Sequence, residues 1–220
     1  MRSVIFLILL AVLVLYLIWQ VRKPTKWIGR LFAGMMNSSH SDLTDWGLLH
    51  VHIDKQFQIL DVGCGGGRTI QKLAEAATEG KVFGIDHAAG SVALSRQTNA
   101  LLIESGRVEI QGASVSQLPF SDDAFDLVTA VETQYYWPDL IKDMKEILRV
   151  LRPGGSLIII AESYKGGRYA AIQRPVMWLL RSTLLSMDEQ RELFSAVGYT
   201  NVQLFEERAK GWICATGKKP

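Results

Sequence analysis

The most conspicuous candidate for a binding site is a glycine-rich turn at residues 60–70, which reads LDVGCGGGRTI. It follows an apolar run and precedes a helical pattern, and glycine inside either element costs about 0.5–1 kcal/mol. The start of a helix carries free N–H groups and a partial positive charge that favour an anion. The bare backbone therefore predicts a site for a carboxylate or phosphate of a ligand.

Two aspartates accompany this turn. Asp61 precedes the first glycine by two residues, and Asp86 ends the next apolar run, VFGID. An acid at the end of the second strand of a parallel sheet binds both hydroxyls of a ribose. A dinucleotide fingerprint would need a glycine where this chain has Arg68. At this point the turn and Asp86 can still belong to an NAD-dependent oxidoreductase with an irregular fingerprint, or the turn can be purely structural.

The elements that would position these residues alternate between strand and helix. Apolar runs predict seven strands, at 57–62, 81–86, 107–112, 125–132, 156–163, 200–207 and 211–217. Helical patterns lie at 68–80, 90–106, 139–151 and 186–198, and the last opens with a capping box from Ser186 to Glu189. We expect an α/β fold, a Rossmann-like doubly wound and mostly parallel seven-stranded sheet that ends in an antiparallel hairpin.

The first segment differs from the rest of the chain in its uncharged, apolar composition. Residues 3–19 read SVIFLILLAVLVLYLIW and carry no charge, and 17 residues lie at the short end of the ~17–25 that span a bilayer. A secretory signal peptide would have a shorter apolar core and a small-residue cleavage site. We therefore expect an uncleaved transmembrane helix at residues 1–23.

Charge patterns suggest orientation and exclude some partners. Basic residues follow the apolar segment at Arg22, Lys23, Lys26 and Arg30, so the positive-inside rule places the C-terminal part in the cytoplasm. Residues 24–220 hold 21 basic and 22 acidic residues, a balance that argues against nucleic-acid binding. Neither of the two cysteines belongs to a CxxC pair, so we expect no metal site.

Three further stretches join the glycine turn and Asp86. They read VFGID, LPFSDDAFDLVTAVET and RVLRPGGSLII. With them the chain resembles the class I S-adenosylmethionine-dependent methyltransferases, in particular the type 11 group, over about residues 57–217. The resemblance implies S-adenosylmethionine as the cofactor, a methyltransferase domain at 57–220, and a helical lead-in at 24–56 that covers the cofactor.

The resemblance also implies cofactor contacts. Its motifs assign them to Asp61, Gly63, Cys64, Gly65, Gly67, Asp86, His87, Ser114, Val115 and Ala130. The glycine backbone would lie under the methionine part, which Asp61 and the Ala130 carbonyl would hold at its amino end. Asp86 would bind the ribose and His87 would lie along the adenine. Ser114 stands where many relatives have an acid that reaches the adenine, and Cys64 is interpreted as a small packed residue.

Methyl transfer needs little activation, because the sulfonium already makes the methyl electrophilic. Alignment of the acceptor can supply about 7–11 kcal/mol, and a general base adds about 10²–10⁴-fold where the acceptor must lose a proton. The candidates for such a base are Glu132, Tyr135 and Tyr136 after the fourth strand, and His40 in the lead-in. For each of them, a role in packing or capping is the alternative.

Residues 164–185 read YKGGRYAAIQRPVMWLLRSTLL, which is apolar and basic. Gly166 and Gly167 could hinge it, so we expect a substrate lid that touches the bilayer, with a plain packing helix as the alternative. The whole pattern predicts a membrane-anchored, cytoplasm-facing methyltransferase acting on a small or lipophilic acceptor. A non-catalytic, membrane-tethered module that binds S-adenosylmethionine is the rival from another class.

Overall fold

The computed structural model of the chain describes residue 6 and residues 41–220. The predicted anchor at 1–23, apart from residue 6, and the first part of the lead-in, 24–40, lie outside the described residues. Within the part that is described, no helix is both long and apolar enough to cross a bilayer.

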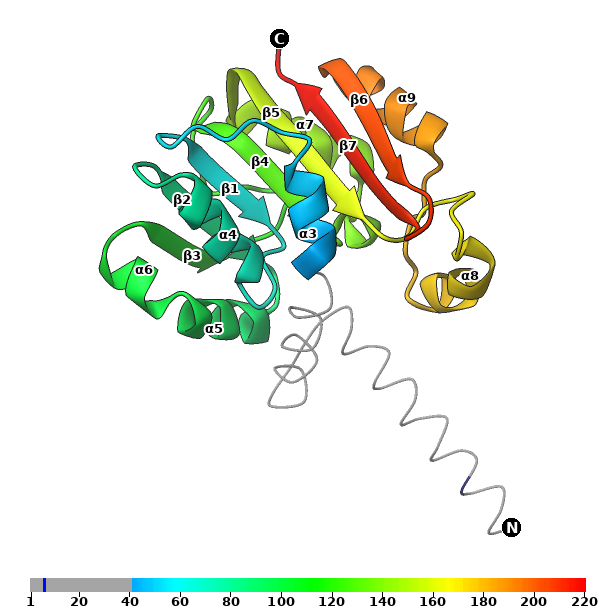
Figure 1. The fold of residues 1–220 in the computed structure, drawn as a ribbon, viewed down its shortest axis with the longest axis horizontal. Coiled ribbons are helices and arrows are strands. Elements are labelled where there is room, and N and C mark those ends of the chain that lie inside the picture. Colours follow the sequence, from blue (N-terminus) through cyan, green and yellow to red (C-terminus); the bar gives the residue numbers. More distant parts are fainter. Residues whose placement is uncertain (1–5, 7–40) are drawn as a thin grey trace.

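A seven-stranded sheet forms the centre of the molecule, in the order β3-β2-β1-β4-β5-β7-β6 (Figure 1). The strands are β1 (Gln58–Val62), β2 (Lys81–Asp86), β3 (Val108–Gly112), β4 (Phe125–Val131), β5 (Leu151–Ala161), β6 (Thr200–Glu207) and β7 (Trp212–Lys218). The neighbours among β1 to β5 pair in parallel, whereas β7 runs antiparallel to both β5 and β6. The seven predicted strands and the closing hairpin are therefore confirmed.

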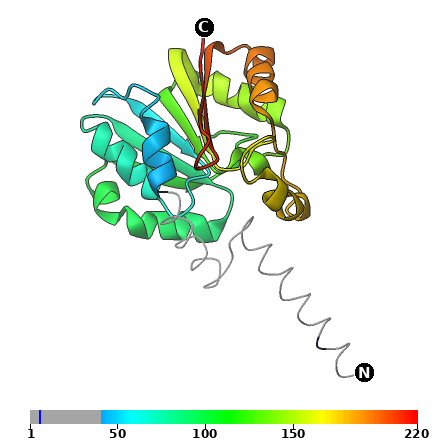
Figure 2. The same ribbon diagram turned by 45° about the vertical axis from the view of Figure 1, so that its right-hand side comes forward.

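Helices cover both faces of this sheet, as Figure 2 shows. The helices of the described residues are α3 (Ser41–Leu48), α4 (Arg68–Ala76), α5 (Ala89–Thr98), α6 (Ala100–Glu104), α7 (Leu140–Val150), α8 (Ala170–Leu179) and α9 (Met187–Val197), with a short 3₁₀ helix η1 (Gln134–Tyr136). Of these, α8 lies beyond the ends of the strands and not on a face (Figure 1). Leu43 of α3 and Ile70 of α4 belong to one buried cluster, and Met144 of α7 and Phe194 of α9 belong to another. The arrangement is the doubly wound one that the alternating pattern predicts.

Several boundaries differ from the prediction. The helix expected at 68–80 ends at Ala76, and in the described part of the lead-in, 41–56, only Ser41–Leu48 is helical. The helix expected at 90–106 is broken at Asn99, whose side-chain amide donates to the carbonyls of Gly67 (3.0 Å) and Ser95 (2.9 Å). Strand β5 begins at Leu151 rather than 156, because Leu151 pairs with Phe125. The predicted capping box at Ser186 is confirmed.

Candidate functional site

The glycine turn joins β1 to α4 through a left-handed backbone. Gly63, Gly65 and Gly67 have φ angles of 78°, 50° and 85°, a region that other L-residues enter at a cost of about 1–2 kcal/mol. A Cβ on Gly63 would lie 2.4 Å from Thr133 Cγ2, and one on Gly67 would lie 2.4 Å from Asn99 Nδ2. A Cβ on Gly65 would meet only a distant carbonyl, at 4.0 Å. The glycines thus shape the turn and its packing more than they clear space for a ligand.

Hydrogen bonds fix this turn to the end of β2. The N–H groups of Gly63 and Cys64 donate to the Ile85 carbonyl at 2.8 Å and 2.9 Å. Asp86 accepts from Gly65 N–H (3.1 Å) with one oxygen and from Ala88 N–H (2.8 Å) with the other. Burial raises the pKa of this carboxyl, which is 8% exposed. The side chain of Ser91 is a third donor to the same carboxylate.

A cavity of about 340 Å³ opens beside the turn. Its wall is built by α3, the glycine turn, the end of β2, the loop after β3 and the segment after β4. Of the residues that the sequence singled out, those on the wall are Gly63, Cys64, Gly65, Asp86, His87, Ser114, Val115, Glu132 and Tyr136. The structure therefore brings most of the predicted contacts together at the carboxyl ends of the parallel strands, where such sheets bind ligands.

Four of the predicted residues do not line this cavity: Asp61, Gly67, Ala130 and Tyr135. Asp61 lies in the buried part of β1, where it accepts a hydrogen bond from Thr129 Oγ1 at 2.6 Å. Burial raises the pKa of Asp61 to about 7. Ala130 is fully buried in β4. His40 lies outside the described residues.

Cys64 and His87 differ in exposure although both line the cavity. Burial raises the pKa of the Cys64 thiol well above its usual value, so at neutral pH it is a packed thiol and not a nucleophile. The His87 side chain is 52% exposed, and its Nδ1 lies 3.6 Å from Asp86 Oδ1.

The segment after β4 carries the polar groups on the opposite wall. Glu132 has a φ of 58°, and its Oε1 accepts hydrogen bonds from Tyr135 OH (2.9 Å) and from Glu162 N–H. Tyr135 OH in turn accepts from Ser163 N–H at 3.0 Å. Burial raises the pKa of Tyr135 well above 10, so this hydroxyl stays protonated at neutral pH. Tyr135 holds Glu132 in place, and its neighbour Tyr136 reaches the cavity wall instead.

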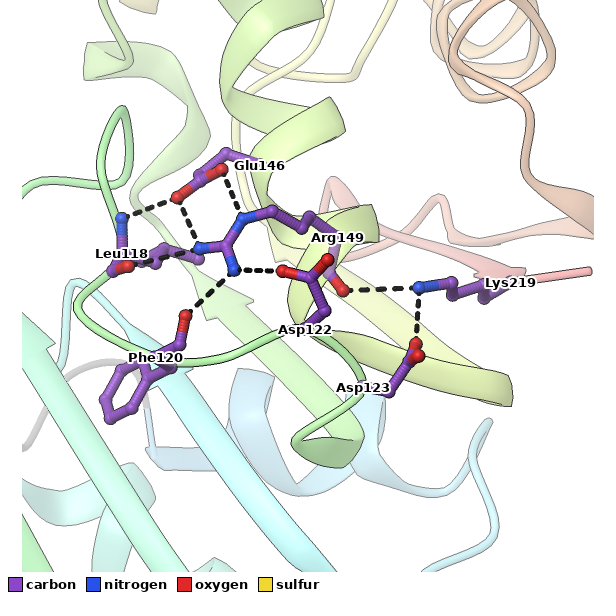
Figure 3. Close-up of polar contacts among 7 residues, drawn as sticks. All are labelled: Leu118, Phe120, Asp122, Asp123, Glu146, Arg149 and Lys219. Atoms are coloured by element: carbon purple, nitrogen blue, oxygen red, sulfur yellow. Dashed lines mark hydrogen bonds and ion pairs between the residues drawn. The ribbon is translucent and has the colours of Figure 1, made fainter.

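The loop after β3, which supplies Ser114 and Val115, is fixed from behind by Arg149 of α7 (Figure 3). The Arg149 guanidinium donates to the carbonyls of Phe120 (2.8 Å) and Leu118 (3.2 Å) and pairs with Asp122 and Glu146. Hydrogen bonding to Arg149 holds the pKa of Glu146 below its usual value. A planar guanidinium donates hydrogen bonds in fixed directions, so it fixes the position of the loop backbone as well as pairing with the carboxylates.

Sequence reasoning did not single out several residues of the wall. Ser41 and Thr44 of α3 lie on it, and so do Thr133, Trp137 and Pro138 after β4. Trp137 and Pro138 continue the aromatic stretch that begins at Tyr135, so the composition of this stretch could have indicated that they line the cavity. The α3 residues reach the cavity only through tertiary packing, which no local pattern reveals.

Comparison with known proteins identifies the family. A family model described as a methyltransferase domain matches residues 60–159. A demethylmenaquinone methyltransferase of Bacillus mycoides is 30% identical over 168 residues, which cover 66% of this chain and 70% of that protein. A sterol 4-C-methyltransferase of Caenorhabditis elegans is 34% identical over 117 residues, covering 50% of this chain and 34% of the relative.

A solved structure shares the fold. The crystal structure of a SAM-dependent methyltransferase from Aquifex aeolicus superposes with a TM-score of 0.71 at 18% identity, covering 87% of this chain and 98% of the other. This chain spans only 34% to 54% of the length of three curated relatives that it matches. Motifs, fold and relatives agree: the chain belongs to the class I S-adenosylmethionine-dependent methyltransferases.

Proposed function

We propose that this chain transfers the methyl group of S-adenosylmethionine to a small or lipophilic acceptor at the cytoplasmic face of a membrane. The observation that carries the transferase activity is the single cavity in which the glycine turn, Asp86 and Glu132 meet. The apolar segment at residues 3–19 supports the membrane location, and the basic residues that follow it support the orientation. Two relatives are named for sterol and menaquinone chemistry, which supports a lipophilic acceptor.

The residues of the wall fit the cofactor. The Asp86 carboxylate lines the cavity at the end of β2, the position at which an acid binds ribose hydroxyls in doubly wound sheets. Ile85, Ala113 and Val115 give an apolar surface for a flat ring. The first turn of α4 has no side-chain cap at Gly67, and Arg68 and Thr69 of that turn line the cavity, where the positive end of the helix favours the carboxylate of the methionine part. A cavity of about 340 Å³ holds one ligand of drug-like size.

The acceptor side lies between β4 and α7. S-adenosylmethionine supplies a sulfonium-borne methyl group that needs no further activation. Glu132 supplies a carboxylate that two donors already hold at the wall. That carboxylate favours the positive charge of the cofactor, and it can take a proton from an acceptor that must lose one. Tyr136 and Trp137 supply the aromatic surface beside it, which suits an apolar acceptor.

The test uses the full chain in native membranes with S-adenosylmethionine labelled in its methyl group. We expect label in the organic extract for the wild type and for Asp188→Asn, which changes an exposed residue of α9, and none for Asp86→Asn. Cofactor binding without transfer to any lipid or aqueous fraction would indicate the non-catalytic module. Label confined to aqueous small molecules would contradict the lipophilic acceptor.

A further inference from the structure

The exposed apolar surface of the molecule is concentrated on α8. Among the residues that the structure describes, nine large apolar side chains are exposed, and five of these lie between 169 and 179. They are Tyr169, Ile172, Val176, Trp178 and Leu179, and we call them the outer face of α8. Ile172 is 77% exposed and Trp178 is 79% exposed. Such a contiguous group marks an interaction site more often than isolated apolar residues do.

The opposite side of the same helix is already satisfied. Met177 and Leu180 are buried in a cluster with Tyr135, Tyr164 and Ile213. The helix is thus apolar on two sides, of which one packs on the domain and one faces outward. A surface helix normally buries its apolar side chains and turns polar ones outward, so the exposed apolar side chains of the outer face indicate an apolar partner.

The charges around the outer face indicate what that partner is. Residues 164–185 contain four basic residues and no acidic one. Lys165 pairs with Glu189, and Arg168 donates to the Ala209 carbonyl, whereas Arg174 and Arg181 are exposed on or beside the helix. Apolar side chains with a tryptophan, flanked by arginines, are the pattern of a helix that lies in the interface of an anionic bilayer.

The position of α8 is consistent with such a contact. Figures 1 and 2 show α8 beyond the carboxyl ends of the strands, at the end of the sheet that carries the cavity. None of residues 164–185, all of which are described, lines the cavity, so α8 does not act as a closed lid in this structure. Tyr136 packs against the cluster beneath α8 and also lines the cavity. A bilayer at the outer face would therefore adjoin the acceptor side.

We propose that the outer face of α8 seats the domain on the surface of an anionic bilayer. This inference deepens the proposed membrane location, and it depends neither on methyl transfer nor on the anchor. Neutralising Arg174 and Arg181 should weaken the contact, because each basic residue near an anionic surface favours the bound state about fivefold.

The experiment places a fluorescent label on the outer face of the full chain. Ile172→Cys is labelled with an environment-sensitive dye, and Leu101→Cys, which is 81% exposed on α6, is the matched control. The native Cys64 and Cys214 are buried and should not react. The protein is reconstituted in phosphatidylcholine vesicles with or without phosphatidylglycerol, and lipids that carry a quencher report contact. Flotation of the protein with the vesicles at high salt, which weakens electrostatic contacts, measures attachment through the apolar N-terminal segment separately.

We expect the label at 172 to be quenched in phosphatidylglycerol vesicles at low salt while the label at 101 is not. Adding Arg174→Gln and Arg181→Gln should remove most of that quenching. Equal quenching at the two positions would overturn the inference even if flotation shows that the anchor holds. A blue shift at 172 that grows with protein concentration in detergent alone would instead indicate a second copy of the chain. If the label at 172 is shielded from aqueous iodide at every protein concentration in detergent, another part of the same chain covers the outer face. Self-association and cover by the same chain would each overturn the inference.

Discussion

The two sides of the cavity are held in different ways. On the cofactor side, the glycine turn donates hydrogen bonds to Ile85 and Asp86, and Arg149 donates to the loop after β3. On the acceptor side, hydrogen bonds hold Glu132 and Tyr135. The short helix η1 and the neighbouring α8, which lies off the cavity wall, rest on an apolar cluster, and α8 leaves its outer face exposed. A cofactor with fixed polar groups requires fixed backbone positions, whereas an apolar acceptor mainly requires surface. The comparison predicts that substitutions on the cofactor side are the more damaging ones.

The largest expected effect concerns Asp61, beneath the cofactor side. Its pKa is raised from 3.8 to about 7 by burial, so the folded chain holds a proton there that the unfolded chain has lost. The contribution of this proton to the free energy of unfolding is complete below about pH 4. It is lost as the pH rises towards 7, and the free energy of unfolding falls by up to about 4 kcal/mol. Chemical unfolding across this range should show the decline in the wild type. The decline should be smaller in Asp61→Asn, and equal slopes would contradict a raised pKa.

The next effect concerns the glycine turn itself. Gly67→Ala adds a Cβ at 2.4 Å from Asn99 Nδ2 on a backbone with φ 85°. We expect a loss of about 2–4 kcal/mol in the free energy of unfolding, from backbone strain and overpacking together. Gly106→Ala is the matched control, because φ is 76° there and no atom lies within 4 Å. It should cost about 1 kcal/mol, and equal losses would show that packing of the turn is unimportant.

A smaller effect separates two arginines. Arg149→Met removes the guanidinium that holds Leu118 and Phe120, so the affinity for S-adenosylmethionine should fall about tenfold, or about 1.4 kcal/mol. Arg152→Met removes an ion pair with Asp126 and a hydrogen bond to the Asp123 carbonyl, neither of which lines the cavity, and should change the affinity less than about twofold. Titration of both variants measures the difference, and similar affinities would mean that the loop needs no support.

The smallest effect is expected on the acceptor side. Tyr135→Phe leaves the Ser163 N–H without its acceptor, which should cost about 1 kcal/mol of stability. The hydroxyl lies off the cavity wall, so cofactor affinity should stay within about twofold of the wild type. Thermal unfolding and titration of the same preparation measure both. A large loss of affinity would show that the two sides are not separate.

The same contrast explains what the sequence could predict. The strands and part of the cofactor wall follow from short motifs, since Gly63 and Asp86 lie at strand ends that periodicity locates. The break at Asn99 depends on a carbonyl 32 residues away in sequence, and no local pattern contains that contact. Likewise, the turn at η1 decides that Tyr136, and not Tyr135, reaches the cavity. The direction of a side chain in the turn after a strand depends on tertiary packing. The sequence therefore cannot show which of two adjacent tyrosines lines the cavity.

The central claim is that Asp86 and the glycine turn bind S-adenosylmethionine. Calorimetric titration of the full chain with S-adenosylmethionine, S-adenosylhomocysteine and NAD, beside Asp86→Ala, tests it most directly. We predict that the wild type binds the first two ligands and not NAD, and that Asp86→Ala binds them at least about tenfold more weakly, because a charge-assisted hydrogen-bond acceptor is lost. Binding of NAD alone, or unchanged affinity in Asp86→Ala, would contradict the assignment of this site.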